Sequence, residues 1–190
     1  MISAIKDSIK STISVIDAIY GDDLIIEQIS TSVSIICQSY RAKGKVLFCG
    51  NGGSAADAQH FAAEFTGRFM FDRDPLPAEA LHANTSYLTA VANDYSFDLI
   101  YSRLVKATGC IGDVLFAIST SGNSKNIINA IIQAKSQNMK VIGLTGITGG
   151  QMNEICDVCI KVPSNVTPRI QEGHIVIGHL ICELVEKELF

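Results

Sequence analysis

The hydrophobic positions follow two different periods along the chain. Near the start, isoleucines recur every three or four residues, at Ile2, Ile5, Ile9, Ile13 and Ile16. A second set with the same spacing comprises Ile25, Ile29, Val33, Ile36, Cys37 and Tyr40. Apolar residues at this spacing share one face of a helix. We therefore predict a helical hairpin over residues 1–43, whose apolar surface packs either on its own domain or on a second protomer.

Beyond Gly44 the pattern changes to short, uninterrupted apolar runs. They cover residues 46–49, 114–118, 141–144 and 158–162, with a weaker run at 78–82. Segments of helical length separate them, and this alternation is typical of a parallel sheet with helices on both faces. A last long helix is predicted from Pro168 to about Leu189, with Thr167 as its N-cap. The chain is thus predicted to be a single domain, residues 1–190, with an α/β core over 44–190.

Composition narrows the range of functions. The 190 residues are 47% hydrophobic and 18% charged, with a net charge of −4, which indicates a globular chain. No block of Lys and Arg is present, so nucleic acid is not an expected partner. The first twenty residues interleave charges with apolar residues, unlike a signal peptide, and no run is long enough for a membrane span. We expect a cytoplasmic protein.

The six cysteines give little direct guidance to function. They are Cys37, Cys49, Cys110, Cys156, Cys159 and Cys182, and most lie in apolar runs. Without a secretion signal they are interpreted as small buried hydrophobic residues. Cys156 and Cys159 form a CxxC motif, but no second pair accompanies it, and a metal or redox role is the alternative interpretation.

Two polar loops follow apolar runs in the same way. The glycine loop is residues 51–54, Asn-Gly-Gly-Ser, and the serine loop is residues 119–124, Ser-Thr-Ser-Gly-Asn-Ser. Ligands of parallel sheets bind beyond the carboxyl ends of the strands, and free N–H groups at a helix start favour an anion. Plain turn formation is the alternative. Neither loop matches a Walker or dinucleotide motif, so a small phosphorylated molecule is the expected ligand.

His60 and Glu64 lie one turn apart on the helix predicted over residues 55–66. One interpretation is a solvated face with a Glu64–Arg68 ion pair, although the neighbouring apolar residues indicate a largely buried helix. The other is functional, because a carboxylate near a phosphate loop can move a proton, and His with Glu can share a metal. The last helix offers Gln171, Glu172, His174 and His179, which are not decisive by themselves.

Longer blocks of sequence carry a family resemblance. They read NGGSAADAQHFAAEFTGR, VANDY, AISTSGNSKNI, GLTG and RIQEGHIVIGHLICELVE. In this order they resemble the phosphoheptose isomerase (sedoheptulose 7-phosphate isomerase) branch of the sugar isomerase (SIS) domain family. The resemblance implies a flavodoxin-like, three-layer α/β/α sandwich with a five-stranded parallel sheet, assembled as a homotetramer. It also implies isomerisation of D-sedoheptulose 7-phosphate to D-glycero-D-manno-heptose 7-phosphate through an enediol, for lipopolysaccharide or capsule biosynthesis.

The same resemblance implies residue roles. Glu64 corresponds to the catalytic base and His179 to its acid/base partner. One zinc ion per subunit is implied, held by His60, Glu64, Gln171 and His179. The implied substrate-binding residues are Asn51, Gly52, Gly53, Ser54, Glu64, Arg68, Asn93, Asp94, Ser119, Thr120, Ser121, Ser124 and Gln171.

Helix geometry adds a prediction about the site. Gln171 and His179 are eight residues apart, or about 12 Å along a helix and roughly 80° around it. One ion can hardly bind both from one helix, so we predict active sites between protomers, with at least one ligand from a partner.

Three other functions are alternatives to this isomerase activity. One is a non-catalytic SIS tetramer that binds a DNA replication initiator, which the presence of Glu64 and His179 disfavours. The others are a sugar-phosphate sensor and an isomerase or aldolase-like enzyme for another sugar phosphate.

Overall fold

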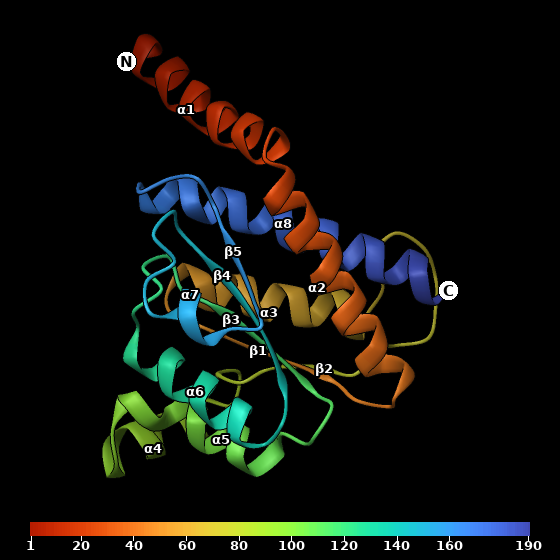
Figure 1. Ribbon diagram of the computed structural model, residues 1–190. Helices are drawn as coiled ribbons and strands as arrows, with labels where there is room; N and C mark the ends of the chain where they lie inside the picture. The colour runs from red at the N-terminus through yellow and green to blue at the C-terminus, as the bar shows by residue number, and fades with distance from the viewer.

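Five parallel strands form one sheet between two layers of helices (Figure 1) in the computed structural model, which describes residues 1–190. The strand order is β2-β1-β3-β4-β5. The bounds are β1 (Val46–Gly50), β2 (Ala78–Ala80), β3 (Val114–Ile118), β4 (Lys140–Thr145) and β5 (Val158–Lys161). This is the flavodoxin-like order. The predicted fold class is confirmed, and the weak run at 78–82 is a short edge strand.

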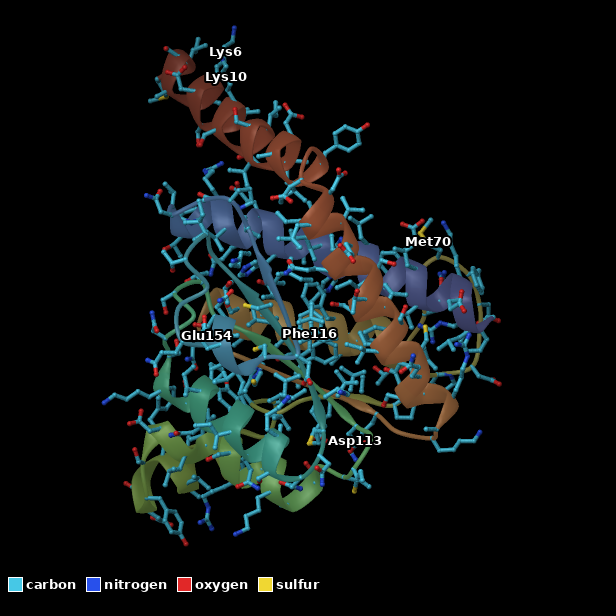
Figure 2. The ribbon with its side chains drawn as sticks, in the orientation of Figure 1. Lys6, Lys10, Met70, Asp113, Phe116 and Glu154 are labelled. Carbon is cyan, nitrogen blue, oxygen red and sulfur yellow. The ribbon has the colours of Figure 1, made fainter.

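The strands are apolar throughout because both faces of the sheet are covered. Every residue of β1 and β3 is buried. Since successive side chains point to opposite faces, Phe48 and Phe116 enter one core and Leu47 and Leu115 the other. Figure 2 shows Phe116 in the middle of the molecule.

The helices divide between the two faces of the sheet (Figure 1). One core contains residues of α2 (Asp23–Arg41), α3 (Gly53–Thr66) and α8 (Thr167–Leu189). The other contains residues of α4 (Thr85–Asp94), α5 (Ile100–Thr108), α6 (Lys125–Ser136) and the short α7 (Met152–Ile155); a 3₁₀ turn, η1 (Phe97–Leu99), precedes α5. None of the helices combines the length and the hydropathy that crossing a membrane requires.

The start of α8 differs by one residue from the prediction. Thr167 is already helical, Val166 occupies the N-cap position, and no side chain caps this end. Pro168 still falls in the first turn, where its missing N–H leaves no intrahelical bond unmade.

The two N-terminal helices are present but do not lie side by side as a hairpin. In α1 (Ile2–Tyr20) only Ile19 is buried, and Ile2, Ile5, Ile9 and Ile13 are 53–74% exposed. Figures 1 and 2 show α1 projecting from the body, with Lys6 and Lys10 near its outer end, while α2 continues away from it. The middle of α1 is tied to α8 instead, because Thr12 Oγ1 donates to Glu172 at 2.8 Å and Arg169 donates to the Ser8 carbonyl. Helical periodicity predicted the helices but could not say which surface each one meets.

Candidate active site

The glycine loop owes its shape to two residues without side chains. Gly52 has φ +58° and ψ −123°, a conformation that residues with a Cβ rarely adopt. Gly53 begins α3, and a Cβ there would collide with the carboxamide of Gln171 on α8. The neighbouring Ser54 is buried against Gly50. The first glycine therefore sets the direction of the chain, and the second lets α8 approach the start of α3.

Helices α3 and α8 stay in contact along their length and run in the same direction. Gly53 meets Gln171 at one level, and Phe61 meets Gly178 about two turns further on. A Cβ on Gly178 would overlap the Phe61 ring, so this contact also depends on a missing side chain. The close packing brings His179 of α8 next to His60 of α3.

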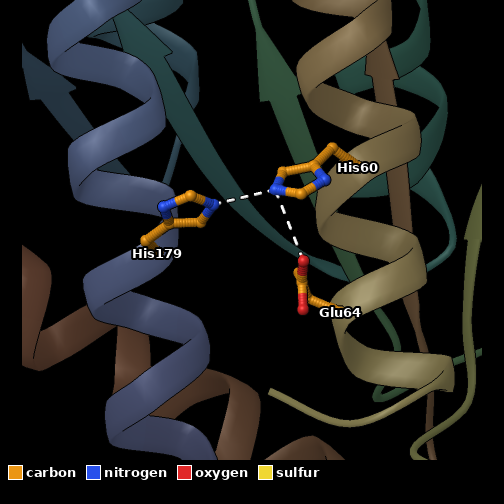
Figure 3. A group of neighbouring side chains, drawn as sticks. All are labelled: His60, Glu64 and His179. Carbon is orange, nitrogen blue, oxygen red and sulfur yellow. Dashed lines mark hydrogen bonds and ion pairs between the residues drawn. The ribbon is translucent and has the colours of Figure 1, made fainter. Parts of the chain in front are cut away.

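His60, Glu64 and His179 form one group between these helices (Figure 3). The Nε2 atoms of His60 and His179 are 2.8 Å apart, and His60 Nε2 lies 3.4 Å from Glu64 Oε1. His60 is 43% exposed and Glu64 22%, so the group is open to solvent on one side. Phe61 and Phe69 pack around the His179 ring, at centroid distances of 6.3 and 5.5 Å. The alternative Glu64–Arg68 pair does not form, since Glu64 faces His60.

The donor atoms of this group fit a metal ion. Two imidazole nitrogens and one carboxylate oxygen lie within 4.8 Å of one another. Ligands about 2.1 Å from a tetrahedral zinc ion are roughly 3.3 Å apart, close to the separations found here. Gln171 lies apart from the group, because its carboxamide contacts Gly53, seven residues or about 10 Å before His60 along α3. Three of the four predicted ligands thus converge within one chain, and a ligand from a partner stays a prediction.

The serine loop gathers hydroxyl groups at the end of β3. Ser119 Oγ lies 3.1 Å from Ser124 Oγ and 3.4 Å from Ser121 Oγ. Ser121 Oγ also accepts from the N–H of Asn123. Three residues of the loop, Thr120, Ser121 and Asn123, line a cavity of about 320 Å³. Its other lining residues are Gly146, Ile147, Thr148, Ser164, Asn165, Thr167 and Ile170. Hydroxyls and amides without a carboxylate suit a phosphate group.

A side chain that the sequence analysis missed joins the two loops. Asn126, buried in the first turn of α6, exchanges two hydrogen bonds of 2.9 Å with Asn51 of the glycine loop. Strands β1 and β3 are paired neighbours with Gly50 opposite Ile118, so the loops that follow them are adjacent. The Asn51 carboxamide is engaged in this link. No local pattern distinguishes such an asparagine from an ordinary one near a helix start.

Three predicted substrate-binding residues lie away from this group. Arg68 is exposed just beyond the end of α3. Asn93 and Asp94 are exposed at the end of α4, on the opposite face of the sheet, where Asn93 donates to Asp94 at 2.9 Å. Within one chain, the structure does not bring these three residues to His60 and Glu64.

The sequence analysis also missed a buried ion pair, which lies against the C-terminal end of α3. Arg73 donates to Glu186 at 2.7 Å, and both side chains are at most 2% exposed. Arg73 also donates to the Glu64 and Phe65 carbonyls, which satisfies the free end of α3. Glu186 accepts the N–H groups of Phe69 and Met70, on the segment that Figure 2 shows beside the end of α8. The pair fixes the backbone that carries Glu64 and places Phe69 against His179.

Asp57, one turn before His60, has an unusual carboxyl group. Burial raises its pKa to about 6, although the positive charge of His60 acts in the opposite direction. Its Oδ2 atom is buried without a hydrogen-bond partner. Burial without a hydrogen-bond partner therefore favours the neutral form of this carboxyl group.

The sheet thus carries two polar loops at the carboxyl ends of β1 and β3, and a His–Glu–His group on the helices that cover one of its faces. The family model described as "SIS domain" matches residues 15–146, more than half of the chain. The chain belongs to the SIS domain family.

Curated relatives of this chain are phosphoheptose isomerases. The phosphoheptose isomerase of Rhodospirillum rubrum is 59% identical over 161 residues, covering 85% of this chain and 86% of that protein. That of Aneurinibacillus thermoaerophilus is 52% identical over 186 residues, covering 98% and 94%.

Solved structures of phosphoheptose isomerases agree with this assignment. The enzyme from Neisseria gonorrhoeae superposes with a TM-score of 0.90 at 42% identity, covering 96% of this chain and 98% of that one. The enzyme from Francisella tularensis gives 0.94 at 35% identity, covering 98% of each chain. The chain is thus similar in sequence and in fold to ketose–aldose isomerases.

Proposed function

We propose that this chain isomerises D-sedoheptulose 7-phosphate to D-glycero-D-manno-heptose 7-phosphate, for the synthesis of heptose-containing lipopolysaccharide or capsule. The observation that carries the proposal is the convergence of His60, Glu64 and His179 between α3 and α8. The similarity to phosphoheptose isomerases over almost the whole chain supports the substrate.

Glu64 is the group that moves the carbon-bound hydrogen. Isomerisation of a ketose to an aldose takes a proton from C1 and returns it to C2, through an enediol. A single carboxylate can perform both transfers on one face of the substrate. Glu64 Oε1 faces His60, which leaves the second oxygen of the carboxylate for the substrate.

His179 moves the hydroxyl protons. Its Nε2 faces His60 Nε2, and a zinc ion held by both rings would occupy these two nitrogens. The other ring nitrogen of His179 would then accept a proton from one substrate oxygen and return it to the other. Phe61 and Phe69 shield the His179 ring from bulk water.

His60, Glu64 and His179 would hold a zinc ion, with Gln171 as the fourth predicted ligand. When bound, such an ion polarises the substrate oxygens and stabilises the negative charge that develops on them. The two imidazole nitrogens and the carboxylate support zinc as the metal.

The serine loop is proposed to hold the phosphate. Ser119, Ser121 and Ser124 cluster there, and N–H groups at the start of α6 add a positive field. Binding energy gained at the phosphate orients the distant C1 and C2 atoms next to Glu64. Asn93, Asp94 and Arg68 complete the substrate site in this proposal.

The working form is proposed to be a homotetramer with active sites between protomers. Support comes from the exposed isoleucine stripe of α1 and from an apolar groove of about 550 Å³ between α2 and α8. The distance of Gln171 from the other ligands, and of Asn93 and Asp94 from the site, is consistent with contributions from neighbouring protomers. A cytoplasmic location follows from the substrate, since sugar phosphates are cytoplasmic metabolites, and it suits six free cysteines.

The direct test is incubation with sedoheptulose 7-phosphate in D₂O, with NMR detection of the product. We expect the aldose phosphate to form with deuterium at C2. A zinc chelator should slow turnover, and added zinc should restore it. Failure to convert or exchange the ketose phosphate with zinc present would refute the enzymatic function. Analytical ultracentrifugation tests the tetramer independently.

A further inference from the structure

The cysteines of the CxxC motif lie side by side, away from the proposed active site. Cys156 directly follows α7, and Cys159 lies in β5 opposite Gly143 of β4. A Cβ on Gly143 would be 2.8 Å from Cys156 Sγ and 3.5 Å from Cys159 Sγ, so both sulfurs flank the same point. Each sulfur is a neighbour of the other in this space, and Met152 closes it on a third side. The missing side chain of Gly143 leaves room for the pair.

The surroundings distinguish the two sulfurs. The neighbouring Cys156 thiol lowers the pKa of the Cys159 thiol, and Thr145 Oγ1, 3.8 Å from Cys159 Sγ, acts in the same direction. The Cys159 thiol and burial together raise the pKa of Cys156. Cys159 is therefore the member of the pair that loses its proton more readily, and the thiolate is the reactive form of a cysteine. Both residues line a surface cavity of about 350 Å³ against α2.

We propose that Cys156 and Cys159 form a reversible intrachain disulfide when the protein meets hydrogen peroxide. The Cys159 thiolate attacks one peroxide oxygen, the O–O bond breaks, hydroxide leaves and a sulfenic acid forms. The Cys156 sulfur then attacks the Cys159 sulfur, and its proton leaves with the hydroxyl group as water. Two thiols are oxidised and one peroxide is reduced to two waters. An external dithiol reverses the reaction by exchange.

The pair is coupled to the serine loop through α7. The Met152 N–H donates to the Gly122 carbonyl at 3.1 Å, and the Gln151 N–H donates to Asn123 Oδ1 at 3.0 Å. Helix α7 has only four residues and ends at Cys156, so joining Cys156 to Cys159 displaces the whole element. Oxidation therefore loosens the serine loop. This consequence depends on no assumption about the substrate or the metal.

Mass spectrometry tests the disulfide. The full chain is treated with hydrogen peroxide, blocked with iodoacetamide and digested with trypsin, which releases residues 141–161 with Cys156 and Cys159 as their only cysteines. We expect this peptide unalkylated and two hydrogens lighter, and alkylated again after dithiothreitol. Cys159→Ser should abolish the change, whereas Cys110→Ser, at an exposed cysteine, should not. Full alkylation of both residues, or a cross-link to Cys49, would overturn the proposal.

Hydrogen exchange tests the coupling without an activity assay. In the disulfide form, backbone amides of residues 119–124 and 151–153 should exchange about tenfold faster than in the reduced form. Peroxide-treated Cys159→Ser should show no change. Equal exchange rates in the reduced and disulfide forms would disprove the link between the pair and the serine loop.

Discussion

The glycine loop and the serine loop begin from the same local pattern, an apolar strand followed by small residues and a helix, yet they recruit different neighbours. Gly53 lacks a side chain and lets α8 approach, which delivers His179 to His60. Gly122, with φ +65°, packs instead on the backbone of Gly149, in the segment that leads to α7. One loop therefore leads to the His60–Glu64–His179 group and the other to a cluster of hydroxyl groups. Two equivalent positions at the sheet edge therefore differ in their chemistry, because a different element packs against each of them.

The largest effect is expected at the helix that follows the glycine loop. Glu64→Gln should lower kcat about 10³-fold or more, because the amide cannot accept a carbon-bound proton, while the fold is retained. His179→Ala should have a comparable effect. NMR assays of heptose phosphate formation measure both. Glu154→Gln, at an exposed carboxylate of α7 marked in Figure 2, is the matched control and should behave as wild type. Full activity in Glu64→Gln would remove it as the base.

The next largest effect is expected in the pH dependence of the free energy of unfolding, through His174. His174 is fully buried, its Nε2 lies 3.1 Å from the Thr145 carbonyl, and burial lowers its pKa from 6.5 to about 4. Between these two values the unfolded chain binds the proton and the folded chain does not, so stability falls as pH drops from 6.5 toward 4. The loss should approach about 3 kcal/mol at the lower end.

Urea titrations at several pH values measure this effect. His174→Gln has no titrating group, and it should show a smaller loss over the same pH interval. Thr145, whose carbonyl faces His174, is followed by Gly146, and the Gly146 N–H donates to the Thr120 carbonyl of the serine loop. Protonation of His174 should therefore disturb these residues first. Identical pH profiles for both proteins would exclude His174 as the cause.

Substitution in the serine loop should separate binding from chemistry. Ser124→Ala should raise KM for sedoheptulose 7-phosphate about tenfold and change kcat by less than about threefold, because in the proposed function the lost hydroxyl holds the phosphate, which does not react. Steady-state kinetics measure both constants. Ser136→Ala, at the far end of α6, is the control. A fall in kcat with constant KM would show that the loop acts in proton transfer instead.

The smallest effect is expected at two glycines, Gly52 and Gly112, whose backbones have a similar positive φ. Gly52 and Gly112 have φ of +58° and +86°, and neither has an atom within 4 Å of the position a Cβ would take. Each change to Ala should therefore cost about 1 kcal/mol in stability through backbone strain alone. Only Gly52→Ala should also reduce turnover, because it redirects the start of α3. Denaturation and kinetics on both variants measure this, and equal turnover would show that the loop tolerates the strain.

The residues that local pattern could predict were those whose environment is set by their own segment. The runs at 46–49 and 114–118 are apolar because both faces of β1 and β3 are covered, and the strands appeared where expected. The packing of α1 could not be predicted, since its isoleucine stripe defines a face but not the surface it meets. The links from Asn51 to Asn126 and from Arg73 to Glu186 span 75 and 113 residues, beyond any local signal.

By itself the sequence determined the alternation of strands and helices, the two small-residue loops, and the placement of His60 and Glu64 on one helical face, because each follows from local spacing and backbone preference. Its family blocks also implied that His179 is the acid/base partner of Glu64. Only the tertiary structure decided that His179 meets His60 while Gln171 lies two turns away, that Asn126 joins the loops, and that Cys156 and Cys159 share one pocket. These contacts depend on two elements approaching closely, as they do where a glycine leaves no side chain between them. Such an approach is a property of the packed chain, and no single segment determines it.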